Sequence, residues 1–116
     1  MIGSARMGLA SAAVAFALTL GAAPSWGEDL ASYTLTIRQH RFEPTEIEIP
    51  AGKKISLVVK NLDATPEEFE SIELHREKVV SGGSEITVYI GPLKPGRYEF
   101  FGDFNPDTAR GHIIAK

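Results

Sequence analysis

Apolar and polar residues alternate along most of the chain after residue 30, and this alternation predicts β-strands. In segment 31–37, Tyr33, Leu35 and Ile37 alternate with serine and threonine residues. Side chains on a strand point alternately to its two faces, so this segment would bury one face and expose the other. The same period of two recurs in three further segments, which are 45–49, 54–62 and 85–90.

Segment 67–74 can be interpreted in two ways. It places Phe69 among glutamates, which are good helix formers, so a short helix beginning after Pro66 is one alternative. A strand is favoured because the surrounding chain alternates with period two. Segment 39–44 interrupts the alternation and predicts a connection. Three short segments complete the pattern, at 78–80, 97–101 and 111–115.

These segments predict an all-β fold. Seven or eight short strands are separated by turns rich in glycine and proline, and no segment predicts a long helix. Such spacing is typical of an antiparallel β-sandwich with Greek-key connections. We therefore expect one domain built around a single core.

The first residues have the pattern of a signal peptide. Arg6 precedes the uncharged segment 7–20, which is long enough for export but short for a membrane span of about 20 residues. Ser25 and Gly27 are small residues that suit cleavage after Gly27, whereas cleavage after Ala23 and an uncleaved anchor are the alternatives. We expect residues 1–27 to be a signal peptide, residues 28–116 to be the domain, and the product to be periplasmic with no stable membrane span.

Composition narrows the possible chemistry. The sequence has 12 basic and 15 acidic residues and a formal net charge of −3, so it lacks the basic surface that nucleic-acid binding requires. It has no cysteine, and both methionines, Met1 and Met7, lie in the predicted signal peptide. Any metal would therefore be bound by His, Asp, Glu, carbonyl or water oxygen. No nucleophile elbow or zinc-ligand spacing indicates a hydrolase.

Several short motifs follow one another in a fixed order, namely Phe42-Glu43-Pro44, Ile49-Pro50-Ala51-Gly52-Lys53, Asn61, Glu67-Glu68-Phe69-Glu70-Ser71, Leu93-Lys94-Pro95-Gly96-Arg97-Tyr98 and Gly111. In this order they resemble the cupredoxin-like domain of bacterial iron-transport proteins, both FtrB-like periplasmic proteins and EfeO-type proteins. The resemblance implies a cupredoxin-like Greek-key β-sandwich and a role in ferrous iron uptake. It also implies two partners, an inner-membrane iron permease and a second periplasmic iron- or copper-binding protein.

The resemblance to blue-copper cupredoxins fails at the ligands. Those proteins place a cysteine just after the aromatic strand, and the matching position here is Gly102. A histidine upstream in plastocyanin-like proteins matches Glu67 or Glu68. Because thiolate defines a blue-copper site, this chain is not expected to form one.

Carboxylates are the candidate ligands that remain. In a cupredoxin-like sandwich, Glu68, with Glu67 or Glu70, would lie at the same end as the loop that carries Asp103 and Asp107. Crowded carboxylates repel one another unless a cation or a basic side chain neutralises them. An oxygen-rich site suits iron(III), manganese(II) or calcium, and an added imidazole from His40 would also suit copper(II) or iron(II). The alternatives are solvated surface acids, or ion pairs with Arg97 or Arg110.

Two functions are open from the sequence. The first is a metal-binding accessory protein of periplasmic iron uptake, with an iron or copper ion bound by carboxylates. The second is a metal-free β-sandwich that acts as a protein-interaction module. Metal binding by the purified protein distinguishes them.

Overall fold

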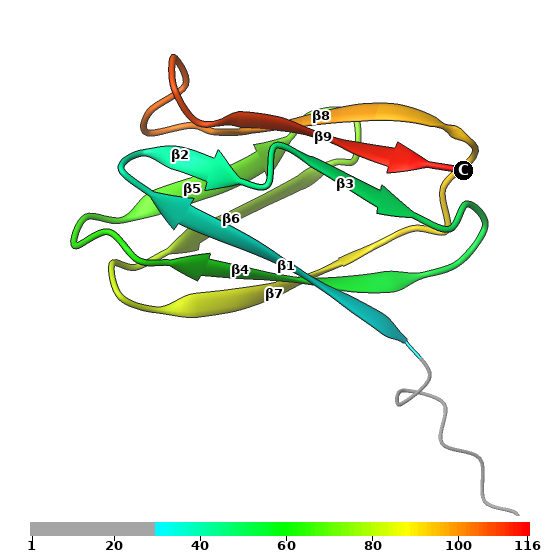
Figure 1. Cartoon of the computed structure of the whole chain (residues 1–116), viewed down its shortest axis with the longest axis horizontal. Coiled ribbons are helices and arrows are strands. Elements are labelled where there is room, and N and C mark those ends of the chain that lie inside the picture. Colours follow the sequence, from blue (N-terminus) through cyan, green and yellow to red (C-terminus); the bar gives the residue numbers. More distant parts are fainter. Residues whose placement is uncertain (1–29) are drawn as a thin grey trace, which may run out of the picture.

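The computed structural model describes residues 30–116, which form two β-sheets packed face to face (Figure 1). The predicted signal peptide lies outside these residues. Among residues 30–116, no helix has the length and apolar character that a membrane crossing needs. The strands of this region are β1 (Ala31–Arg38), β2 (Arg41–Glu43), β3 (Glu46–Ile49), β4 (Ile55–Asn61), β5 (Glu67–Ser71), β6 (Arg76–Val80), β7 (Glu85–Ile90), β8 (Gly96–Gly102) and β9 (Arg110–Ala115).

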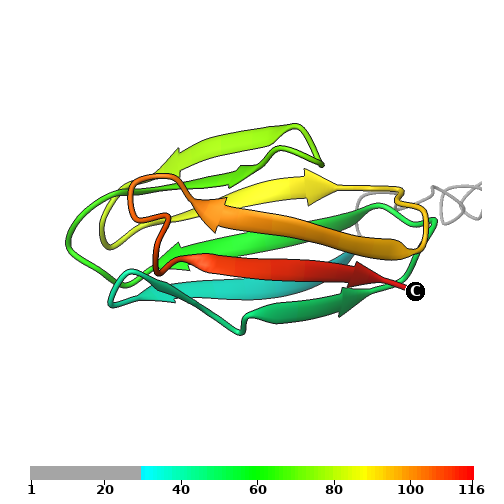
Figure 2. The same ribbon diagram turned by 90° about the horizontal axis from the view of Figure 1, so that it is seen from above.

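The strands are divided between a four-stranded and a five-stranded sheet. The four-stranded sheet has the order β2-β1-β4-β7, and the five-stranded sheet has the order β3-β9-β8-β5-β6, which Figure 2 shows from above. The predicted all-β sandwich is therefore confirmed. Segment 67–74 forms a strand up to Ser71 and then turns, so the helical alternative is wrong.

Two details of the prediction differ. The described region has nine strands where seven or eight were predicted, because β2 lies in segment 39–44, which is too short to show alternation. The sheets are also mixed, since β1 pairs with β4, and β3 with β9, in parallel. After the β1–β2 hairpin the chain crosses to the other sheet as β3 before it returns as β4, and such a crossover is what parallel pairing requires.

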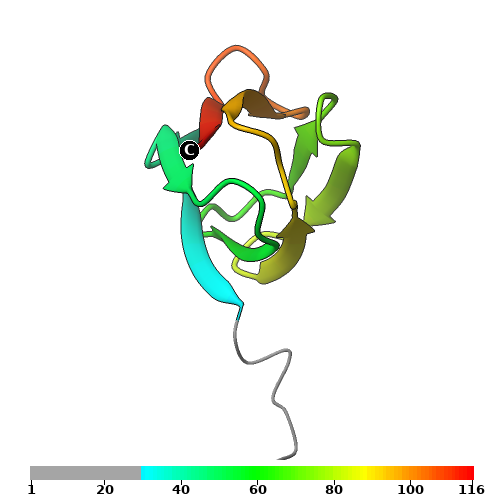
Figure 3. The same ribbon diagram turned by 90° about the vertical axis from the view of Figure 1, so that its right-hand side faces the viewer.

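The core lies between the inner faces of the two sheets, which Figure 3 shows along the strands. The alternating apolar residues of each strand fill this core, and Leu35 and Ile37 of β1 are examples that are fully buried. Three buried aromatic rings pack together near one end, with centroids 5.1 Å apart for Phe42 and Phe100 and 5.5 Å apart for Phe69 and Phe100. Phe69 and Phe100 belong to β5 and β8, so this cluster fixes the two strands that carry the predicted site.

Four connections gather at one end of the sandwich, the left end in Figure 1, which we call the loop end. They are 39–40, 62–66, 81–84 and 103–109. Buried Asn61 ties two of them, 62–66 and 81–84, because its Nδ2 donates to the carbonyls of Thr65 and Ser81 and its Oδ1 accepts from the Asp63 N–H. The C-terminal residue lies at the opposite end.

Candidate functional site

Three carboxylates converge on the outer face of the five-stranded sheet. Because Phe69 points into the core, its neighbours Glu68 and Glu70 point outward, and Asp103 follows β8 at the start of the next loop. The Asp103 N–H donates to the Glu68 carbonyl at 2.9 Å, which holds the loop against β5. One carboxylate oxygen of each residue lies within 4.8 Å of the other two, so the three could bind one ion. We call Glu68, Glu70 and Asp103 the carboxylate triad.

Glu77 of β6 adds a fourth negative charge beside the triad. It lies opposite Glu70 in the β5–β6 pair. Partial burial, followed by the charge and hydrogen bonding of Glu77 and Asp103, raises the pKa of Glu68 to about 7. Partial burial and the same two neighbours also raise the pKa of Glu70. The apo site therefore holds mutually repelling carboxylates that a proton or a cation would relieve.

Arg97 and Arg110, the two arginines expected as alternatives to a metal, have other partners. Arg97 pairs with Glu46 at 3.0 Å, and Arg110 pairs with Glu99 at 2.9 Å and lies over the ring of Phe101. Within residues 30–116, no lysine, arginine or histidine forms an ion pair with a triad carboxylate. The structural alternative to a metal, an arginine–carboxylate pair, is therefore wrong for the described residues.

Glu67 lies on the opposite face of β5 and is only 1% exposed. Its Oε1 accepts from the Phe104 N–H at 2.8 Å and the Glu68 N–H at 3.0 Å, and its Oε2 accepts from Asn105 Nδ2 at 2.8 Å. These bonds join β5 to the 103–109 loop. Glu67 is thus an internal anchor of that loop and not a member of the carboxylate triad.

Gly102 is in close contact with this anchor. A Cβ at Gly102 would lie 2.6 Å from Cδ of Glu67 and 2.8 Å from Cβ of Ala109, distances that side chains do not tolerate. The resemblance described above matches Gly102 to the cysteine of blue-copper cupredoxins, and in this structure the Glu67 carboxylate occupies the space next to it. The residues present do not fit a blue-copper centre, and the sequence has no cysteine to supply its thiolate.

His40 and Asp107 lie at the loop end, outside the triad. Both line a shallow hollow of about 400 Å³. Gln39 and His40 have positive φ angles of 54° and 59°, and both of their N–H groups donate to the Asp63 carboxylate. Although burial opposes it, these hydrogen bonds lower the pKa of Asp63. The hairpin turn is thereby held in a conformation that costs a non-glycine residue energy.

The structure thus brings together two of the five predicted metal ligands, Glu68 and Asp103, and separates them from Glu67, Asp107 and His40. Sequence reasoning missed Glu77, because it began the strand at residue 78 and so left this glutamate in a loop. The alternation of β6 about its buried Val80 is the signal that would have placed Glu77 on the outer face.

Comparison with known proteins shows a family match and a similar bacterial protein. Residues 8–115 match the cupredoxin-like domain family. The chain is also similar to an uncharacterized protein of Rickettsia prowazekii (strain Madrid E), with 48% identity over 87 residues, which cover 75% of this chain and 70% of that protein.

Solved structures share the fold at low sequence identity. Auracyanin A, a blue copper protein from Chloroflexus aurantiacus, superposes with a TM-score of 0.63 at 12% identity, covering 74% of this chain and 98% of auracyanin. The metal-binding domain of the Cu(I)-exporting P-type ATPase CopA from Streptococcus pneumoniae D39 superposes with a TM-score of 0.63 at 14% identity. The match covers 73% of this chain and 84% of that domain. With this fold and the family match over most of its length, the chain belongs to the cupredoxin-like domain family.

Proposed function

We propose that this protein is a metal-binding accessory protein of periplasmic ferrous iron uptake, and that it holds an iron or copper ion at the carboxylate triad. The observation that carries the proposal is the set of three carboxylate oxygens within 4.8 Å with no basic side chain paired to them in residues 30–116. Oxygen ligands favour hard cations, so iron suits this site better than Cu(I). The fold supports a metal role because similar structures include copper proteins.

The cellular setting is part of the same proposal. The pattern of Arg6 and segment 7–20 supports export to the periplasm. The resemblance to FtrB-like and EfeO-type proteins supports an inner-membrane iron permease and a second periplasmic iron- or copper-binding protein as partners. The ion would then be a cargo that the triad binds and passes on.

Equilibrium binding of Mn(II), Fe(II) and Cu(II) to the purified protein tests the metal role. We expect saturable binding of one ion, and we expect Glu68→Gln to weaken it by about tenfold or more, because it removes one anionic ligand at close range. Glu85→Gln is the matched control, since Glu85 is exposed on β7 of the other sheet. If Glu68→Gln binds each ion as the parent does, the metal role fails and the metal-free interaction module replaces it.

Copper(II) gives a second expected result. The protein loaded with Cu(II) should be nearly colourless, because the intense visible band of a blue site needs a copper–thiolate bond and the sequence has no cysteine. A visible absorption spectrum, recorded at about one equivalent of Cu(II), checks this. An intense visible band would contradict the ligand assignment.

A further inference from the structure

Two edge strands, β6 and β7, face each other on one flank of the sandwich and are bridged by side chains. Arg76 Nε donates to the Tyr89 carbonyl at 2.9 Å, and Lys78 Nζ reaches towards the Thr87 carbonyl at 3.4 Å. The two strands belong to different sheets and share no backbone ladder. A cleft lined in part by Arg76 lies at one end of this flank.

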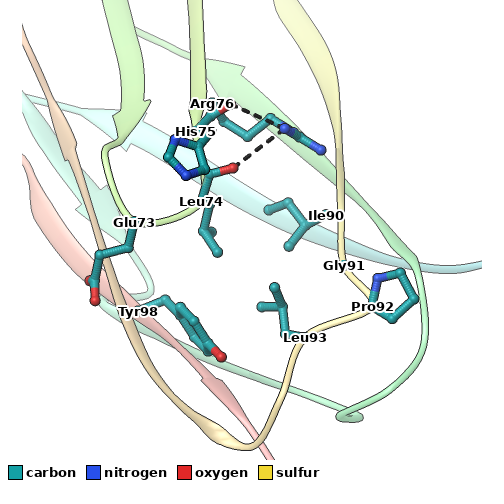
Figure 4. A pocket seen from close by; sticks show the side chains of 9 residues that line it. All are labelled: Glu73, Leu74, His75, Arg76, Ile90, Gly91, Pro92, Leu93 and Tyr98. Atoms are coloured by element: carbon teal, nitrogen blue, oxygen red, sulfur yellow. Dashed lines mark hydrogen bonds between the residues drawn. The ribbon is translucent and has the colours of Figure 1, made fainter.

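This cleft has a volume of about 250 Å³ and lies between the β5–β6 turn and the connection from β7 to β8 (Figure 4). Figure 4 shows the side chains of Leu74, Ile90 and Leu93 pointing towards one another across its centre. Leu74 and Ile90 are 9% and 1% exposed and belong to the core, and Leu93 packs against it. The cleft therefore offers an apolar floor that is already formed.

A fixed positive charge lies at the rim. The Arg76 guanidinium is held by three carbonyl groups, through Nε to Tyr89 and through Nη1 to His75 at 3.1 Å and Leu74 at 3.4 Å. Carbonyl partners orient the group without neutralising it, and within residues 30–116 Arg76 has no ion pair. Its Nη2 does not take part in these bonds and keeps two N–H donors for a further acceptor.

Two other polar side chains at the rim, Glu73 and Tyr98, already have hydrogen-bond partners, while the His75 imidazole also lines the cleft. Glu73 Oε1 accepts from the Glu99 N–H at 2.8 Å, and the Tyr98 hydroxyl donates to the Lys94 carbonyl at 2.7 Å. Figure 4 shows Glu73 on the Tyr98 side of the cleft, away from the Arg76 guanidinium. Arg76 therefore supplies the fixed positive charge for an acceptor at this rim.

We propose that this cleft binds a small amphipathic carboxylate. Its carboxylate would accept from the Arg76 guanidinium, since charge-assisted bonds from arginine to carboxylate are strong and directional. Its short alkyl chain or single ring would pack on Leu74, Ile90 and Leu93. The volume of about 250 Å³ lies below the range of roughly 300–1,000 Å³ of pockets for drug-sized ligands, which limits the ligand to a small molecule. The proposal is independent of the carboxylate triad.

Titration of the purified protein with hexanoate, followed by amide NMR, tests the charge requirement on the unmodified chain. We expect saturable shifts around Leu74, Ile90 and Leu93, with a dissociation constant of about 10 mM or tighter. Hexan-1-ol, which has the same chain without the charge, should bind at least about tenfold more weakly, and hexylamine should not compete. Equal binding of the alcohol, stronger binding of the amine, or no saturable shift would overturn the proposal.

A pair of matched variants tests the role of Arg76 in hexanoate binding. Lys78→Gln is the control for Arg76→Gln, because both side chains reach from β6 to a β7 carbonyl but only Arg76 lines the cleft. We expect Arg76→Gln to weaken hexanoate binding about tenfold and Lys78→Gln to change it less than about twofold. Arg76→Lys keeps the positive charge and loses the planar pair of donors, so its affinity for hexanoate should lie between those of Arg76→Gln and the parent. If Arg76→Gln binds hexanoate as the parent does, the site is wrong.

Discussion

Replacing Glu67 with alanine is expected to lower the free energy of unfolding by about 3 kcal/mol or more, because a buried acceptor of three hydrogen bonds is lost and its donors are left without a partner. In a domain of this size, a loss of about 3 kcal/mol corresponds to a fall in Tm of roughly 12–24 °C. Urea and thermal unfolding, followed by circular dichroism, measure it. Glu85→Ala, which truncates an exposed glutamate, should change stability by less than about 0.5 kcal/mol. A loss below about 1 kcal/mol for Glu67→Ala would mean that this carboxylate does not anchor the loop.

The milder variant Glu67→Gln distinguishes the two faces of β5. It keeps the side chain's size and one acceptor oxygen, so the protein should stay folded. Since Glu67 points inward and the triad lies on the outer face, Glu67→Gln should lower Mn(II) affinity by less than Glu68→Gln does. Should Glu67→Gln weaken Mn(II) binding as strongly as Glu68→Gln does, the ion binds inside the sandwich and the triad is not its site.

The protonation of Glu68 is expected to give cation binding a steep pH dependence. The pKa of Glu68 is raised to about 7, and a cation must displace this proton, so binding tightens as pH rises through that value. For one proton released, Mn(II) affinity should be about tenfold higher at pH 8 than at pH 6. Titrations at both pH values measure this ratio, and Glu68→Gln should reduce it. A ratio near one in the parent protein would show that the ion does not compete with the Glu68 proton.

Glu68 should give the stability of the metal-free protein the opposite pH dependence to that of cation binding. A carboxyl whose pKa is higher in the folded state than in the unfolded chain binds its proton more tightly when folded. Its contribution to stability is complete below the unfolded value of about 4.3 and is lost as pH rises through about 7. From this group alone, metal-free protein should be more stable at pH 5 than at pH 8. Thermal melts of parent and Glu68→Gln isolate that contribution, which the variant should lack.

The alternation of apolar residues was sufficient to predict the sandwich and most of its strands. It failed for β2, because three residues show no period, and for the parallel pairs, because strand order depends on contacts between distant segments. The partners of Arg97 and Arg110 depend on register across neighbouring strands for the same reason. These arginines flank the loop in sequence, yet their carboxylate partners are Glu46 and Glu99.

The sequence did contain the information to divide the glutamates of β5 between its faces. If Phe69 is in the core, a period of two puts Glu67 inside and places Glu68 and Glu70 outside. The role of Glu67 could not be predicted in this way. Two of its three hydrogen bonds come from Phe104 and Asn105, more than thirty residues along the chain, and they depend on the path of an irregular loop.

The contact between Gly102 and Glu67 also limits which substitutions this chain can accept at residue 102. A cysteine at residue 102 would collide with the Glu67 carboxylate, so that substitution is unfavourable while Glu67 is present. Shortening Glu67 first would remove the anchor of the 103–109 loop. Either order of mutation passes through a less stable protein, so a thiolate at residue 102 is difficult to introduce by single substitutions.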